Sequence, residues 1–176
     1  MHEPYNRNPS KEMHSNHSSF QNSNINVLRI FWGKLAQVKH LSFNAKTKLQ
    51  EKNGGWHRRG QGEVVVAKEG SNRLVFNEKG IWEGRSNREI RFSNVFRWTY
   101  CSIGAISLEH LRRGPSHPVF LIHLVPSGEN SLSALDSHLC KEDIYFGQIY
   151  SNSYGLRLSW RVIGPKKNEE IEYCYT

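Results

Sequence analysis

The stretch that decides the fold is residues 89–100, whose sequence reads EIRFSNVFRWTY. Its aromatic residues all fall at even positions, whereas Arg91 and Arg97 fall at odd positions. Successive side chains of a strand point to opposite sides of a sheet, so this alternation predicts a β-strand with one buried face. The aromatic parity includes Trp98 and Tyr100.

Similar short segments follow one another through most of the chain, separated by turn-forming residues such as the KNGG of residues 52–55. An Asn-Gly pair between apolar segments is typical of a hairpin turn. About ten strands with short links predict an all-β fold, a single antiparallel up-and-down barrel of roughly eight to ten strands. We expect the strands at residues 38–49, 60–67, 73–76, 80–82, 89–101, 103–110, 119–125, 133–138, 144–150, 156–163 and 170–175.

The first part of the chain has a different composition. Residues 1–24 are rich in Asn, Ser and His and poor in apolar residues, so we expect a disordered polar tail there. Asn26 has the character of a helix N-cap before a short helix over residues 26–35. Val27, Ile30, Phe31 and Leu35 would form its apolar stripe. The barrel domain is therefore expected to comprise residues 25–176.

Charge and cysteine content narrow the functional classes. The net charge is +8, and residues 1–60 hold ten Lys and Arg against three acidic residues, so the barrel itself is nearly neutral. That distribution argues against nucleic-acid binding, and we expect the basic residues to form an ordinary solvated surface. Three cysteines without a scaffold spacing, no apolar leader and no long apolar segment predict a cytoplasmic protein without membrane insertion.

The arginines on the strands allow two assignments. In residues 156–163, Trp160 belongs to the apolar parity and Arg161 to the polar parity. The plainer assignment places the aromatic faces inside the barrel and the arginines in water. In the alternative, Arg91, Arg97 or Arg161 lines a cavity and binds a carboxylate or phosphate, which the planar guanidinium meets with two hydrogen bonds.

Polar residues that interrupt apolar runs are candidates for chemistry. His123 lies within VFLIHLV, and is either a buried core histidine with a hydrogen-bond partner or a ligand contact. His138, Asp143 and Tyr145 form either an acid/base set or a structural network that ties a strand end to its loop. His138 and Cys140 are too few ligands for zinc and lack the orienting third group of a nucleophilic pair, so no metal or cofactor is expected.

Four elements of the sequence resemble an uncharacterised family known only as a domain of unknown function. They are an early Glu-x-Gly, an Arg followed by an aromatic pair, H-x-C-x-x-D-x-Y, and W-x-V-x-G-P-[RK]-K. The matching residues are Glu78, Gly80, Arg91 or Arg97, Trp98, Tyr100, His138, Cys140, Asp143, Tyr145, Trp160, Val162, Gly164, Pro165, Lys166 and Lys167. The family is itself similar to calycin-type barrels such as lipocalins and fatty-acid-binding proteins, a resemblance that implies a small-molecule cavity.

We therefore expect a barrel that binds an apolar small molecule with a polar or acidic end, of acyl, isoprenoid or tetrapyrrole type. Trp98, Tyr100, Tyr145 and Trp160 would supply walls, and Arg91, Arg97, His123, His138, Arg161 and Lys166 polar contacts. The alternative is a cofactor-independent cyclase, isomerase or lyase that acts on such a ligand, with His138, Asp143 and Tyr145 transferring protons. The sequence leaves the oligomeric state open.

Overall fold

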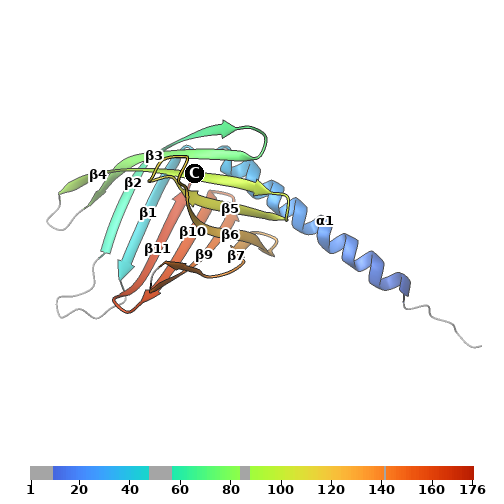
Figure 1. Ribbon diagram of the computed structural model, residues 1–176. Helices are drawn as coiled ribbons and strands as arrows, with labels where there is room; N and C mark the ends of the chain where they lie inside the picture. The colour runs from blue at the N-terminus through green and yellow to red at the C-terminus, as the bar shows by residue number, and fades with distance from the viewer. Residues whose placement is uncertain (1–9, 48–56, 84–87, 141) are drawn as a thin grey trace, which may run out of the picture.

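The described part of the computed structural model, residues 10–47, 57–83, 88–140 and 142–176, contains one helix and a β-barrel (Figure 1). The helix α1 spans Ser10–Leu35. The strands are β1 His40–Thr47, β2 His57–Glu69, β3 Arg73–Glu83, β4 Glu89–Cys101, β5 Ala105–His110, β6 Val119–Gly128, β7 Ser131–Ala134, β8 His138–Cys140, β9 Asp143–Asn152, β10 Gly155–Gly164 and β11 Lys167–Tyr175. The turn expected at residues 52–55 lies outside the described residues.

Ten antiparallel strands close the barrel within the described residues, which confirms the predicted fold class. Neighbours follow in the order β1 to β7, then β9, β10 and β11, and β11 pairs with β1 to complete the ring. The short strand β8 pairs only with β9 among the described strands. Because almost every strand pairs with the next along the chain, short turns are sufficient to connect them.

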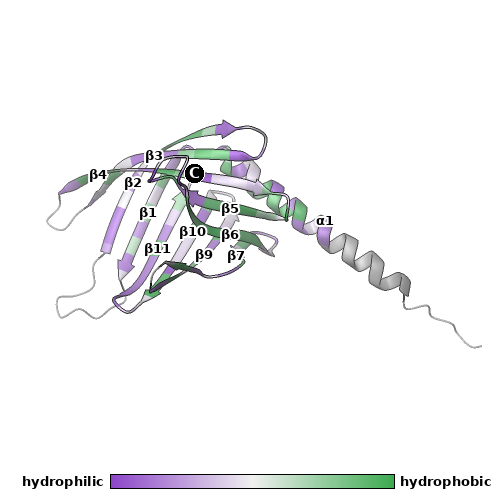
Figure 2. Cartoon of the chain, viewed as in Figure 1, coloured by the Kyte–Doolittle hydropathy of each residue, from purple (hydrophilic) through white to green (hydrophobic). Residues whose placement is uncertain are grey.

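Hydropathy changes from residue to residue along the strands (Figure 2), and in β4 the burial of the side chains follows this alternation. In β4, Trp98 is 1% exposed, and Phe92, Phe96 and Tyr100 pack against the buried core. Ile90, at the start of the same strand, is an exception and is exposed. The arginines of β4 point outward as in the plainer of the two assignments, but only Arg91 is exposed, and the Arg97 side chain is 15% exposed and paired with Glu109.

Helix α1 begins sixteen residues before its expected start, so Asn26 lies inside the helix rather than at its N-cap. Its last turns are fixed to the barrel by Val27, Leu28, Phe31 and Leu35, which are all buried. Extending an existing helix costs much less than nucleating one, so the upstream residues continue the same hydrogen-bond ladder. Ile30, which we expected in the apolar stripe, is 45% exposed, and Leu28 takes its place.

Contacts of α1 show which end of the barrel it covers. Trp32 meets Tyr100 at the end of β4 with ring centroids 5.6 Å apart. Lys34 Nζ donates hydrogen bonds to Ser151 Oγ and to the carbonyl of Asn152, at the end of β9. In an antiparallel barrel the ends of β4 and β9 lie at the same rim, so α1 closes that rim.

Aromatic rings fill part of the opposite half. The rings of Phe43 and Phe92 pack edge to face, 5.6 Å apart. A Cβ at Gly60 would overlap the Phe43 ring, and one at Gly80 would lie 2.7 Å from the Phe92 ring. Glycine at these inward positions therefore allows the rings to lie flat against β2 and β3.

The structure also bears on the membrane prediction. No helix in the described part of the chain is long and apolar enough to cross a membrane.

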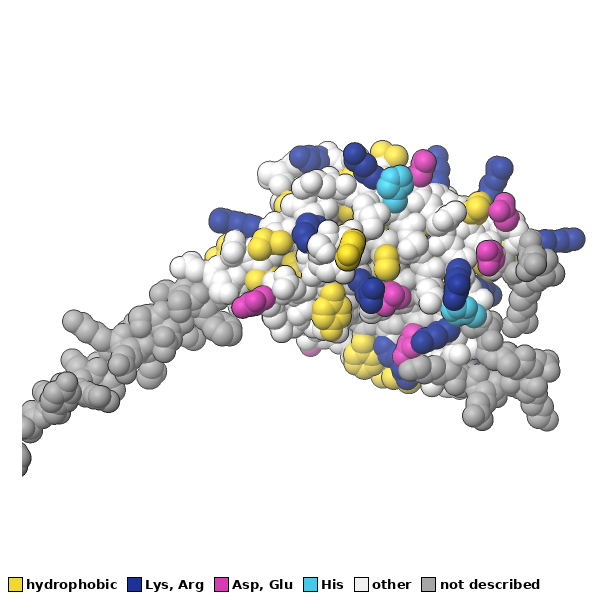
Figure 3. Space-filling view, turned by 180° about the vertical axis from the view of Figure 1, so that it is seen from behind, with side chains coloured by type: hydrophobic (Ala, Val, Ile, Leu, Met, Phe, Trp, Pro, Cys, Tyr) yellow, Lys and Arg dark blue, Asp and Glu magenta, His cyan; other side chains and the backbone are white. Residues whose placement is uncertain are grey.

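The basic residues do not form a separate patch on the face shown in Figure 3, where acidic side chains lie among the Lys and Arg side chains. One basic residue of the N-terminal third, Lys46, pairs with Glu170 at 3.2 Å.

Candidate functional site

A cavity of about 220 Å³ lies inside the barrel, in the half away from α1. Its wall is mainly apolar, and six of the lining residues are Phe96, Leu108, Leu121, Leu158, Trp160 and Val162. They come from β4, β5, β6 and β10, so the cavity is a property of the closed barrel. A concave, mainly apolar space with a few polar groups is the usual form of a small-molecule site.

The polar lining residues near the open rim are His110, Arg112, His138 and Tyr145. His138 is the direct cross-strand partner of Tyr145, and their rings lie 6.0 Å apart. Two members of the predicted set His138, Asp143 and Tyr145 therefore face the cavity together.

Asp143, the third member, does not line the cavity and instead forms an ion pair with a lysine. Its Oδ2 accepts a hydrogen bond of 2.6 Å from Lys167 Nζ. That bond raises the pKa of Lys167, and Tyr145 makes a smaller contribution in the same direction. Lys166, expected as a polar contact, is exposed in the turn before β11, so Lys167 is the lysine that approaches this group.

His110 and Arg112 form a local pair at the rim. The backbone N–H of Arg112 donates to Nδ1 of His110 at 2.9 Å, so a neutral His110 carries its proton on Nε2. Burial, followed by the nearby charge of Arg112, lowers the pKa of His110. A neutral imidazole donor and a guanidinium thus lie at one side of the cavity.

A buried carboxyl lies behind the deep wall. The hydroxyl of Tyr175, a lining residue, donates to Glu78 Oε1 at 2.8 Å. Asn94 Nδ2 donates to Glu78 Oε2 at 3.3 Å. Glu78 is 0% exposed, and burial raises its pKa from 4.5 to about 7 although both hydrogen bonds oppose the shift.

The carboxyl of Glu78 also shifts the pKa values of the two tyrosines of β11. Burial first, and the charge of Glu78 second, raise the pKa of Tyr173 to about 12 and that of Tyr175 well above its ordinary value. The two rings stack with an interplanar angle of 9°. Both hydroxyls therefore remain protonated, and they line the cavity as neutral groups.

The strand arginines do not line the cavity. Arg97 Nε donates to Glu109 Oε2 at 2.7 Å on the outer face, and Arg161 is held by Glu170 at the same distance. Arg91 is exposed. Each alternates with an inward aromatic residue, so none can turn inside without reversing its strand. The guanidinium at the cavity comes instead from Arg112, in the loop after β5.

Three other residues predicted to contact the ligand do not line the cavity. Trp98 and Tyr100 belong to the core nearer α1 rather than to the cavity wall. His123 points outward and is only partly buried, with its ring 4.7 Å from that of Phe120. Of the aromatic walls expected, Tyr145 and Trp160 line the cavity.

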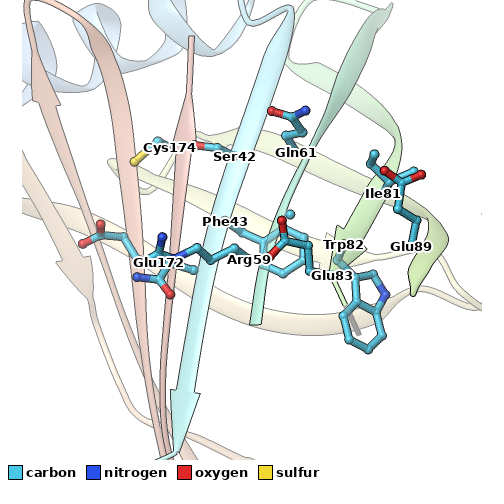
Figure 4. A pocket seen from close by; sticks show the side chains of 12 residues that line it. Ser42, Phe43, Arg59, Gln61, Ile81, Trp82, Glu83, Glu89, Glu172 and Cys174 are labelled. Carbon is cyan, nitrogen blue, oxygen red and sulfur yellow. The ribbon is translucent and has the colours of Figure 1, made fainter. Parts of the chain in front are cut away.

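Hollows on the outer surface are different in character. The one in Figure 4 has a volume of about 480 Å³ and lies over β11, β1, β2 and β3. Outward polar side chains such as Arg59, Gln61 and Glu172 line it, and water reaches all of them. Among the described residues, no group of three or more His, Cys, Asp and Glu is arranged to hold a metal ion. The interior cavity is therefore the stronger candidate for a binding site.

Comparison with protein families gives a match that covers most of the chain. The sequence model of a family described as "Family of unknown function (DUF6314)" matches residues 42–176, from the third residue of β1 through β11. No curated protein and no solved structure matches the chain.

Proposed function

The chain belongs to the family of unknown function DUF6314, and we propose that its barrel binds a small, largely apolar molecule with a polar or acidic end. The observation that carries the proposal is the cavity beside Trp160, which is apolar over most of its wall, polar at its rim and partly open to solvent there. A core that served only stability would be filled with side chains, because unfilled volume inside a barrel lowers stability.

Cavity size limits the ligand. A volume of about 220 Å³ holds about seven groups of water or methylene size, at roughly 30 Å³ each. That is enough for an acyl chain of roughly six to eight carbons or for a small aromatic acid. A tetrapyrrole is several times larger, so the volume favours the smaller members of the expected classes.

The polar end belongs at the rim. Arg112 and His138 line the cavity there, and Tyr145 adds a hydroxyl. Arg112 is exposed, so it can meet a carboxylate without the large desolvation cost of a buried charge. The apolar part would then point inward toward Leu158 and Trp160.

A second candidate is proton-transfer catalysis on the same ligand. It is favoured by the facing pair of His138 and Tyr145, because an imidazole and a phenol beside an apolar cavity are able to exchange protons with a bound molecule. In that case His138→Ala should abolish turnover and leave the ligand affinity nearly intact. If the variant lost both turnover and ligand affinity, His138 would be a binding residue and not a catalytic one.

Binding is tested with octanoate and 2-naphthoate, followed by tryptophan fluorescence because Trp160 lines the cavity. We expect saturable binding that Leu121→Trp, which fills the cavity, abolishes. Val65→Trp is the matched control, since Val65 is 65% exposed on the outer face. Native mass spectrometry of protein purified from its own host should also show a bound molecule. An empty protein that binds neither acid would contradict the proposal.

A further inference from the structure

The barrel wall is not hydrogen-bonded along its whole height. Strand β7 pairs with β6 only from Leu124 onward, and next to this pairing the Leu135 N–H donates a hydrogen bond to the carbonyl of His123. The chain then leaves the sheet and returns as β8, which pairs with β9 through His138–Cys140. Within the described residues, no backbone pairing joins β8 to the first residues of β6.

We call this unpaired part of the wall, between the first residues of β6 and the strand β8, the seam. Both sides of the seam border the cavity. Val119 and Leu121 line it from β6, and His138 and Tyr145 line it from β8 and β9. Across the seam, the ring of Phe120 lies 6.2 Å from that of His138. Side chains, not backbone hydrogen bonds, therefore separate the cavity from the surface here.

Directly below the seam the wall is tight. A Cβ at Gly147 of β9 would lie 2.7 Å from Ile122 Cδ1 and 3.2 Å from the Trp160 ring. The absence of a side chain at Gly147 lets Ile122 of β6 pack onto β9, which closes the barrel where β7 ends. The seam is thus limited to the part of the wall next to the cavity.

One end of the barrel is closed by helix α1, and aromatic rings and an ion pair fill part of the other end. Helix α1 covers one rim with Leu28 and Phe31, both fully buried. At the other rim, Phe43 and Phe92 fill the side of β1 to β4, and the bond between Lys167 and Asp143 joins β11 to β9. Exposed apolar side chains flank the seam instead, with Phe120 at 40% and Leu139 at 66% exposed.

We propose that the seam between β6 and β8 is the entrance to the cavity, and that Phe120 and His138 form its gate. The inference rests on the proposed binding function. Sliding an apolar molecule between side chains breaks no backbone hydrogen bond, whereas passage through a paired part of the wall breaks several. The substrates that fit are narrow apolar acids, whose carboxylate stays near Arg112 after the apolar part has passed the gate.

The experiment cross-links the seam. Phe120→Cys and Leu139→Cys are combined in a chain whose Cys101, Cys140 and Cys174 are replaced by Ser, and a short bismaleimide joins the two thiols. The control pair, Val65→Cys and Asn77→Cys, spans β2 and β3 on the outer face, where the two residues are direct partners. Octanoate and 2-naphthoate binding is followed by stopped-flow fluorescence before and after cross-linking.

We expect the seam cross-link to slow both association and dissociation by roughly tenfold or more, with little change in Kd, because a gate alters rates without altering the bound state. The control cross-link should leave the rates unchanged. Phe120→Ala, which opens the gate, should speed both steps. If the cross-linked seam binds at the original rate, the entrance lies elsewhere although the site stands. If the parent chain binds neither probe, the proposed function falls, and the entrance with it.

Discussion

The hydroxyl of Tyr175 donates to Oε1 of Glu78 across 2.8 Å, although 97 residues separate the two in the chain. The bond joins β11 to β3 across the interior of the barrel. Both partners are buried, and the carboxyl finds hydrogen-bond donors in Tyr175 and Asn94. An acid held by neutral donors is stabilised less in its charged form than one paired with a cation, which is why burial dominates its pKa.

The pH dependence of stability should reveal Glu78. Its folded pKa of about 7 exceeds the ordinary 4.5, so the folded state binds more protons between those values and stability falls as the pH rises through that range. Fully ionised, the group costs about 3 kcal/mol, because one pKa unit equals 1.36 kcal/mol. Glu78→Gln should remove this loss in urea unfolding at pH 5 and pH 8. An unchanged pH slope in the variant would contradict the assignment.

Tyr175→Phe should make the same pH dependence steeper. The variant loses one donor to the carboxyl, and a bond to a charged group contributes about 1.5–3 kcal/mol against about 1 kcal/mol for a neutral one. The destabilisation should therefore be larger at pH 8 than at pH 5. Tyr173→Phe is the matched control, since it removes a hydroxyl from the same face of β11. Equal losses at both pH values would show that the bond does not sense the charge of Glu78.

The barrel itself was predictable from the sequence because the alternation in β4 and β10 is nearly complete. Alternation assigns each residue to a face, and short links make successive strands neighbours. The sequence singles out Glu78 only as part of the Glu-x-Gly element and not as a buried residue, because the strands expected at residues 73–76 and 80–82 leave it in the link between them. The structure has a single β3, in which Glu78 shares the inward parity of Leu74 and Phe76.

The site was harder to predict because alternation shows which side of the sheet a residue faces but not which strands pair with one another. The sequence predicts one strand over residues 133–138, but the chain leaves the sheet after Ala134 and resumes at His138. That break is a property of the whole ring, which must close with β9 beside both β7 and β8. Arg112 was missed for a related reason: it lies in a loop, where side-chain direction follows no period.

Arg112 should matter for acids and not for neutral ligands. Arg112→Gln is expected to weaken octanoate binding by about threefold to tenfold, or about 0.7–1.4 kcal/mol, because the side chain is exposed and its charge partly screened. Octanol binding should change little. Arg113→Gln, which alters an exposed neighbour that does not line the cavity, is the control. Calorimetric titration measures all three proteins, and equal losses for acid and alcohol would exclude a charge-based role.

Two glycines should respond in opposite directions to the same substitution. Gly147→Ala places a methyl group 2.7 Å from Ile122 Cδ1, and relieving that overlap should cost about 1–3 kcal/mol of unfolding free energy. Gly33 lies inside α1, and a Cβ there meets no atom within 4 Å. Gly33→Ala should therefore stabilise the protein by about 0.5–1 kcal/mol through helix propensity. Urea unfolding of both variants measures the contrast. A Gly147→Ala protein as stable as the parent would mean that β6 and β9 are not packed tightly below the seam.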